Sequence, residues 1–362
     1  MKFLLVSGIF PPDIGGPATF IPKFAEFLKK ENHEVRILTL SDKNIDTSNE
    51  TLHVIRVDRK LPKPIRSLQI MWKVLKTPRE FRILANGLHE EVGISLLFKR
   101  NKAVAKIVGD PIWERSRNNS ETDLGLKDFN NSKLRISRRI QRVLLTFALR
   151  RFDAITCPSE ELCEMVDEWG TIENIQHIAN GTEISDSTVQ DQKEFDLICV
   201  SRLVSWKNID RHIQIAGALN LSLAIIGSGP EENNLKNLSK GSNCKVTFFG
   251  ELSQPEILAL MKKSRVFILL SEYEGLSYSL IEALAAGLPA IVSNINANTQ
   301  VVRHEIEGVV VHLDKWEYSL TQVKKMFQDN VIYSRYSAAA RLRIIDQFEI
   351  NKQLSKMEEL LK

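Results

Sequence analysis

Two glutamates bracket the start of a predicted helix, and the residues around them suit a sugar attached to a phosphate. Glu274 lies in a turn, and Glu282 lies inside a helix predicted over 277–286, with seven residues between them. Carboxylates accept hydrogen bonds from the hydroxyls of a sugar or a ribose. The unpaired amides over 276–279 and the helix dipole favour a phosphate. The residues that would line this site are Glu274, Gly275, Leu276, Ser277, Tyr278, Ser279 and Glu282.

A purely structural explanation of the two glutamates is also open. It assigns Glu274 to an N-terminal turn and Glu282 to the solvated face of a helix. This explanation does not account for the many small and apolar residues around Glu282.

Two cations occupy a second strand-to-helix junction. Arg202 and Lys207 lie between an apolar run at 195–200 and a helix that is predicted to start near Ile209. Two cations at a strand end can neutralise a leaving diphosphate without a metal ion. Solvated surface charges are the alternative, because most lysines and arginines are exposed.

A glycine pair marks the first junction of the chain. Gly15 and Gly16 precede a helix that is predicted to open at Pro17. Glycines let backbone amides approach an anion closely, and proline suits a first helical turn. A tight turn without a ligand explains the same residues.

Apolar runs of strand length alternate with helical patterns almost throughout the chain, six before residue 180 and six after it. Continuous apolar runs indicate strands covered on both faces, and the helices between them indicate parallel sheets. We therefore predict an α/β protein with two Rossmann-like domains facing each other across a cleft, over 1–185 and 186–345. The polar stretch 180–193 is predicted to link them, and a helix over 346–362 to cross back onto the first domain. Ligands of such sheets bind at the carboxyl ends of the strands.

Length and composition agree with two soluble domains. The chain has 362 residues, of which 43% are hydrophobic and 26% charged, and these values exclude disordered, collagen-like and disulfide-scaffold proteins. Four cysteines without a Cys-x-x-Cys pair indicate buried, reduced thiols. With no apolar stretch of about 18 residues, nothing is predicted to span a membrane. We expect a cytoplasmic protein, placed peripherally at the inner face of the membrane.

These features together resemble the retaining glycosyltransferases of the GT4 family (glycosyl transferases group 1), which have the GT-B fold. The resemblance rests on Gly15-Gly16, on residues 201–208, on the FFGEL turn at 248–252, and on the two spaced glutamates followed by Gly-Leu-Pro. It implies that Arg202 and Lys207 contact the donor diphosphate. It also implies that Glu282 binds the ribose, that Glu274 binds sugar hydroxyls, and that the loop of Gly250, Glu251 and Leu252 lies beside the base. Gly16 would approach the donor phosphate from the other domain.

The sequence departs from the family in two loops. Many relatives have a histidine in the acceptor loop after the strand at 103–108, where this chain has Asp110 and Glu114. These two become the polar candidates on the acceptor side, with Asp110 added to Arg202, Lys207 and Glu274 as a catalytic candidate. Gln300 stands where many relatives have a glutamate that contacts the donor sugar.

Two basic stretches, 59–82 and 132–151, stand out in the first half of the chain. Residues 1–180 hold 29 basic and 23 acidic residues, against 20 and 22 in the second half. In 132–151, Ile136, Ile140, Val143, Leu144 and Phe147 share one predicted helical face, and Arg135, Arg138, Arg139 and Arg142 the other. A domain helix with a solvated charged face is one explanation, and a surface resting on anionic lipid is another. Nucleic acid is disfavoured, because no aromatic residues interleave with the charges.

No other motif competes with this interpretation. The GSGPEE segment at 227–232 lacks the third glycine of a dinucleotide fingerprint, and no Asp-x-Asp or Cys/His cluster predicts a metal. We therefore expect no cofactor, and transfer of a hexose from a UDP- or GDP-sugar to a hydroxyl acceptor, a glycan or a lipid-linked glycan, in cell-envelope polysaccharide or glycolipid synthesis. Alternatives are another GT-B enzyme, such as a sugar-nucleotide epimerase, and a non-catalytic sugar-nucleotide binder.

Overall fold

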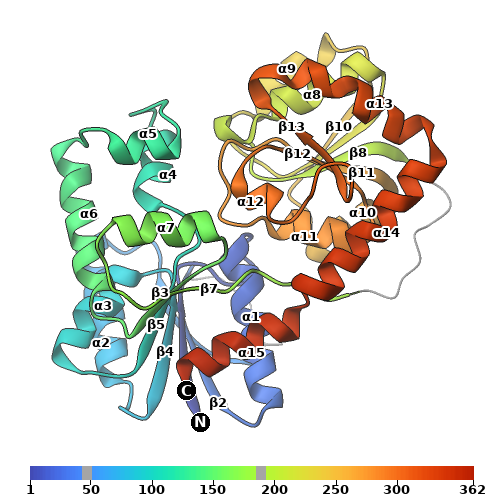
Figure 1. Cartoon of the computed structure of the whole chain (residues 1–362). Helices are drawn as coiled ribbons and strands as arrows, with labels where there is room; N and C mark the ends of the chain where they lie inside the picture. The colour runs from blue at the N-terminus through green and yellow to red at the C-terminus, as the bar shows by residue number, and fades with distance from the viewer. Residues whose placement is uncertain (43–50, 185–192) are drawn as a thin grey trace. The chain divides into compact units, whose positions relative to one another are not determined.

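The computed structural model describes residues 1–42, 51–184 and 193–362, and the chain divides into two compact domains (Figure 1). The first comprises Met1–Ala179 together with Asn351–Lys362, and the second comprises Asn180–Ile350. The change of domain thus falls a few residues before the predicted boundary at 185. The second domain also reaches beyond 345, to Ile350.

The first domain is built on a parallel sheet of seven strands in the order β3-β2-β1-β4-β5-β6-β7. Six of these strands coincide with the predicted apolar runs. The seventh, β7, was missed because it has only three residues and is mostly exposed. The strands are β1 (Lys2–Ser7), β2 (Glu34–Ser41), β3 (His53–Asp58), β4 (Phe81–Asn86), β5 (Ala103–Lys106), β6 (Ala154–Cys157) and β7 (Ile175–His177).

The helices of the first domain connect these strands as crossovers. Helices α2, α3 and α6 pack side by side in sequence order. Helices α3 and α6 approach each other closely at Gly93 of α3, where a Cβ would lie 2.4 Å from the carbonyl oxygen of Ala148 in α6. The helices are α1 (Gly16–Lys30), α2 (Lys63–Lys76), α3 (His89–Phe98), α4 (Pro111–Asn118), α5 (Leu126–Asn131), α6 (Ile136–Leu149), α7 (Glu160–Glu168) and α15 (Ile350–Leu361).

The second domain contains a parallel sheet of six strands in the order β10-β9-β8-β11-β12-β13, and all six lie within or beside predicted runs. Its strands are β8 (Phe195–Val200), β9 (Leu223–Ile226), β10 (Val246–Gly250), β11 (Ser264–Leu269), β12 (Ala290–Ser293) and β13 (Gly308–Val311). Its helices are η1 (Ser205–Lys207), α8 (Ile209–Leu219), α9 (Glu232–Lys240), α10 (Gln254–Lys262), α11 (Tyr278–Ala285), α12 (Asn296–Thr299), η2 (Leu313–Ser319), α13 (Leu320–Gln328) and α14 (Asn330–Gln347). Together these sheets give the two Rossmann-like domains of the predicted GT-B class.

The C-terminal tail forms two helices, α14 and α15, which break at Phe348-Glu349. Helix α15 packs in the first domain. There, both ring nitrogens of His33 take part in hydrogen bonds, one of them with Glu358 of α15. Its Nδ1 lies 3.0 Å from the Met1 amino group, and its Nε2 lies 2.9 Å from Glu358. The two ends of the chain therefore meet at one histidine, and they lie together in Figure 1.

Part of the predicted linker 180–193 is packed into the second domain. Residues 185–192 lie outside the described part of the chain. Thr182 is buried, its amide donates to the Phe348 carbonyl at 3.0 Å, and its own carbonyl accepts from the Ile350 amide at 3.1 Å. The two places where the chain changes domain therefore run next to each other in the second domain.

Candidate functional site

The start of α11 is shaped by the residues that the sequence singled out. Strand β11 is buried, a turn follows it, and the Ser277 side chain caps the helix by accepting from the Leu280 amide. Gly287, with φ of +79°, ends the helix in the left-handed region that favours glycine. The amides that open α11 have no partner inside the helix, so this end is suited to an anion.

Lys207 and Glu274 form an ion pair beside this helix start. The Lys207 ammonium bonds Glu274 Oε1, and the Ser271 hydroxyl donates to the same oxygen at 2.7 Å. Only 11% of the Lys207 side chain and 10% of the Glu274 side chain are exposed. A largely buried pair has a fixed geometry, and the lysine keeps two further N–H donors for a ligand.

Further hydrogen bonds attach the β8–α8 loop to the β11–α11 segment. The Ser279 hydroxyl donates to the Val200 carbonyl at 2.9 Å, at the end of β8. The Glu272 amide donates to Trp206 at 2.8 Å, and the Asn208 side chain donates to Leu270 at 3.0 Å. Because β8 and β11 are neighbours in the sheet, the two sequence motifs meet at its carboxyl edge.

Arg202 and Glu282 differ in their surroundings. Arg202 is exposed, and its guanidinium lies 5.9 Å from the centre of the Trp206 ring. Glu282 is buried in α11, and burial next to this carboxylate raises the pKa of the Tyr278 phenol. The solvated-helix explanation of Glu282 is therefore wrong, because this side chain faces inward.

The glycine-rich loop after β9 packs against the loop that carries Arg202. A Cβ on Gly227 would lie 2.0 Å from the Ser201 carbonyl oxygen, and one on Gly229 would lie 2.3 Å from that of Leu203. The glycines of the GSGPEE segment thus permit close contact between two backbones. Gly250 has φ of +67°, and its carbonyl oxygen accepts a hydrogen bond from the Gly227 amide at 2.7 Å. Leu252, two residues further on, is half-buried.

In the first domain, Gly15 precedes α1 with φ of +147°, a conformation that favours glycine, and Gly16 begins the helix. A Cβ on Gly15 would lie 2.9 Å from the Ile9 side chain. Gly15 is therefore favoured by the turn itself, and the place of the pair near a ligand stays a prediction.

Asp110 has a structural role in the first domain, and its assignment as a catalytic candidate stays a prediction. Its side chain is fully buried, and it caps α4 by accepting from the Ile112 and Trp113 amides at 2.9 and 3.1 Å. Its other oxygen pairs with Arg142 at 2.5 Å. These partners fix the Asp110 carboxylate in place at the start of α4. Glu114, one turn further along α4, is half-buried.

Sequence reasoning missed a polar row at the carboxyl edge of the first sheet. Asn86 ends β4 and Lys106 ends β5, opposite Thr156 of β6 in the register. All three are buried, and each carries a side-chain nitrogen or oxygen without a hydrogen-bond partner. The sequence does contain a signal for this row, because each of these apolar strands has a polar residue at or near its carboxyl end.

His89 joins this edge from the start of α3. Its Nε2 lies 3.1 Å from the Lys106 carbonyl oxygen, and burial lowers its pKa, so the ring is neutral at pH 7. Leu88 before it has φ of +55°, which is strained for a leucine. Strain of this kind gathers at functional sites, and the sequence alone does not reveal it.

Within residues 1–42, 51–184 and 193–362, no three His, Cys, Asp or Glu side chains gather as metal ligands would. None of the helices over the same ranges is both long and apolar enough to cross a bilayer. All four cysteines are free thiols, two of them buried.

Comparison with known proteins agrees with this geometry. Residues 180–343, which include both motifs of the second domain, match the family described as Glycosyl transferases group 1. This match lies wholly within the second domain. The chain is 32% identical to the UDP-Gal:alpha-D-GlcNAc-diphosphoundecaprenol alpha-1,3-galactosyltransferase of Escherichia coli over 137 residues, which are 38% of this chain and 35% of that enzyme.

Other similarities extend over the whole chain. An uncharacterized glycosyltransferase of Haemophilus influenzae is 23% identical over 96% of each chain. TarM of S. aureus, solved in complex with UDP, aligns with a TM-score of 0.79 at 11% identity, over 100% of this chain and 99% of that one. At this identity the structural match establishes the shared fold, which is GT-B.

Proposed function

We propose that this glycosyltransferase moves a hexose from a UDP- or GDP-sugar to a hydroxyl acceptor, with retention at the anomeric carbon. The observation that carries the proposal is the Lys207–Glu274 pair beside the opening amides of α11. A cation, a carboxylate and free amides at one sheet edge suit a sugar diphosphate.

In the proposed reaction the residues of the second domain stabilise the leaving diphosphate. Lys207 and Arg202 supply positive charge, and the amides at 276–279 supply dipoles aimed at the same oxygens. Glu274 holds a sugar hydroxyl and fixes Lys207, while Glu282 holds the ribose and Gly250 to Leu252 lie beside the base. By resemblance to the family, the leaving phosphate then takes the acceptor's proton on the same face of the sugar. No metal is needed in this scheme, so transfer should persist in a chelator.

We place the acceptor at the carboxyl edge of the first sheet. A neutral His89 can accept a hydrogen bond from a hydroxyl, and Lys106 offers a positive charge nearby. The similarity to an enzyme that acts on a diphosphoundecaprenol-linked sugar supports a lipid-linked acceptor, in polysaccharide or glycolipid synthesis at the inner membrane face.

The decisive experiment combines binding and turnover. Thermal-shift measurements with UDP, GDP and their sugars should identify the base, because a ligand that binds the folded state raises the melting temperature. Lys207→Ala should then lower turnover by a factor of roughly 100 to 1000 while the protein stays folded. Lys236→Ala, which removes an exposed lysine of the same domain, is the matched control.

Two outcomes would contradict the proposal. Near-normal turnover in Lys207→Ala and Arg202→Ala would remove their assigned role. Donor binding without transfer or donor hydrolysis in the wild-type protein would favour the silent binder, and conversion of the donor sugar to its epimer would favour an epimerase.

A further inference from the structure

Helix α6 exposes a stripe of apolar residues, although Leu145, Ala148 and Leu149 of the same helix are buried. Its exposed residues follow the spacing of one helical stripe, whereas Arg138 is buried against Glu121 and Arg142 pairs with buried Asp110. The expectation of an outward charged face is therefore only half correct. The exposed stripe consists of Ile136 (80% exposed), Ile140 (55%), Val143 (59%), Leu144 (49%) and Phe147 (40%).

Helices α2 and α3 extend this apolar surface. Ile65, Leu68 and Trp72 form an exposed stripe on α2, and Leu97 and Phe98 are exposed at the end of α3. Of 19 large apolar residues that are exposed in the described chain, ten lie on these three adjacent helices. Such concentration is unusual for a surface exposed only to water.

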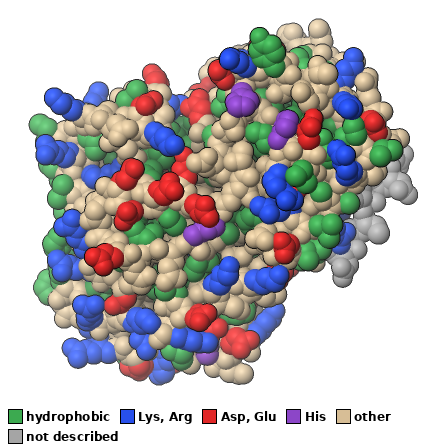
Figure 2. All heavy atoms as spheres, in the orientation of Figure 1, with side chains coloured by type: hydrophobic (Ala, Val, Ile, Leu, Met, Phe, Trp, Pro, Cys, Tyr) green, Lys and Arg blue, Asp and Glu red, His purple; other side chains and the backbone are tan. Residues whose placement is uncertain are grey.

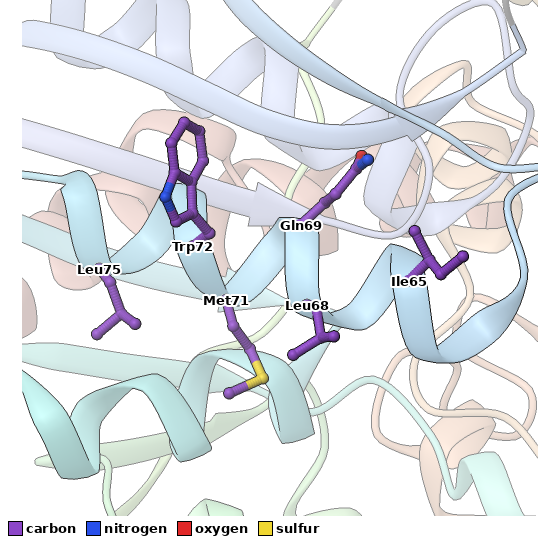
Figure 3. Close-up of a pocket in the computed structure, with 6 residues that line it drawn as sticks. All are labelled: Ile65, Leu68, Gln69, Met71, Trp72 and Leu75. Atoms are coloured by element: carbon purple, nitrogen blue, oxygen red, sulfur yellow. The ribbon is translucent and has the colours of Figure 1, made fainter.

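A shallow groove runs along α2 within this surface. Its volume is about 500 Å³, and its lining is almost entirely apolar (Figure 3). Leu68, Met71 and Leu75 extend from the same side of the helix in that view. The groove and the α6 stripe together form what we call the apolar face, defined by the exposed residues of α2, α3 and α6 named above.

Positive charge surrounds the apolar face. The segments 59–79 and 132–151 contain no acidic residue. The Lys73 and Lys76 ammonium groups lie 5.2 and 4.0 Å from the centre of the Trp72 ring, and the Arg151 guanidinium lies 4.8 Å from that of Phe147. Figure 2 shows hydrophobic and basic side chains intermixed along the edge of the first domain where α6 and α2 lie.

We propose that the apolar face inserts into the interfacial region of a membrane with anionic headgroups, and that the surrounding lysines and arginines bind those headgroups. Amphipathic helices with apolar and aromatic residues on one side and cations at its rim bind membranes in this way. The charge pattern selects this occupant over a second copy of the chain, because two copies would bring like charges together. The proposal goes beyond sugar transfer, since membrane binding needs neither donor nor acceptor.

Vesicle flotation tests the proposal with the full chain. The protein should float with vesicles of phosphatidylcholine and phosphatidylglycerol, and less with phosphatidylcholine alone or at high salt. Ile140→Ser combined with Leu144→Ser should lower the partition coefficient at least about tenfold, because several buried carbons are lost at each site. The matched control is Val331→Ser with Leu342→Ser, two exposed residues of α14 in the other domain, which should bind like the wild type.

Two further measurements make the result unambiguous. Trp72 emission should shift to shorter wavelength on vesicle addition, and Trp72→Phe should remove that shift. Light scattering reports the oligomeric state of wild type and double variant. The proposal is overturned if the wild type ignores anionic vesicles, if the double variant binds as well as the control, or if the face instead holds a dimer that the double variant dissociates. Unchanged donor hydrolysis in the double variant separates this result from any failure of the proposed function.

Discussion

Replacing Lys106 by methionine should stabilise the protein at neutral pH and destabilise it slightly at high pH. Lys106 is fully buried, and among the described residues its ammonium has no hydrogen-bond partner; it lies 4.8 Å from the centre of the Phe20 ring. Burial lowers its pKa from 10.5 to about 8. This difference corresponds to about 3 kcal/mol of unfolding free energy that the charged lysine costs.

The free energy of unfolding depends on pH because the folded and unfolded states bind the Lys106 proton with different affinity. Below about pH 8 both states are charged, so the folded state bears the full cost. Between about 8 and 10.5 the unfolded chain keeps the proton and the folded chain loses it, so the free energy of unfolding rises with pH. Above that range the cost is gone.

Methionine is one atom shorter than lysine and leaves a small void, which costs about 1 kcal/mol. The net gain of Lys106→Met at pH 7 is therefore about 2 kcal/mol, and the two stability curves should cross near pH 10. Urea unfolding of both proteins over this pH range measures the difference. Lys127→Met, at a lysine that is 79% exposed, is the control and should show no such crossing.

The reasoning is refuted if Lys106→Met is less stable than the wild type at pH 7, or if the difference does not change with pH. A direct titration of the lysine side-chain resonances, assigned by the peak that the variant lacks, checks the lowered pKa independently.

Two further predictions concern the packing of the first domain. Asp110→Asn should lower the melting temperature but reduce turnover by far less than the roughly 100-fold expected for a lost acid–base group, because this carboxylate caps a helix and pairs with Arg142; a larger loss in steady-state assays would support its catalytic role. Gly93→Ala should destabilise the domain by about 2 kcal/mol or more, because its Cβ would meet the Ala148 backbone, whereas Gly125→Ala has open space and should be neutral in urea unfolding.

Much of the fold could be predicted from the chain alone. Buried parallel strands are continuous apolar runs, so 12 of the 13 strands in the described part of the chain could be located without the structure. The start and end of α11 were also predictable, since Ser277 and Gly287 act through local backbone geometry. Short, exposed β7 carries no such pattern.

The candidate site was predictable where it depends on residues close in sequence to a strand end. Arg202, Lys207 and Glu274 could be chosen because parallel strands carry their following loops to one edge. That Lys207 bonds Glu274, 67 residues away, depends on β8 and β11 being neighbours, which the sequence does not state.

The residues by themselves determined the α/β class, the strands, the caps and the two motifs of the second domain, because each depends on local periodicity or on turn chemistry. Tertiary structure decided the role of Asp110, the isolation of Lys106 and the outward face of α6. Each of these depends on which distant side chain lies opposite. A helical pattern shows that two faces differ, but only the partners Glu121 and Asp110 determine that Arg138 and Arg142 of α6 turn inward.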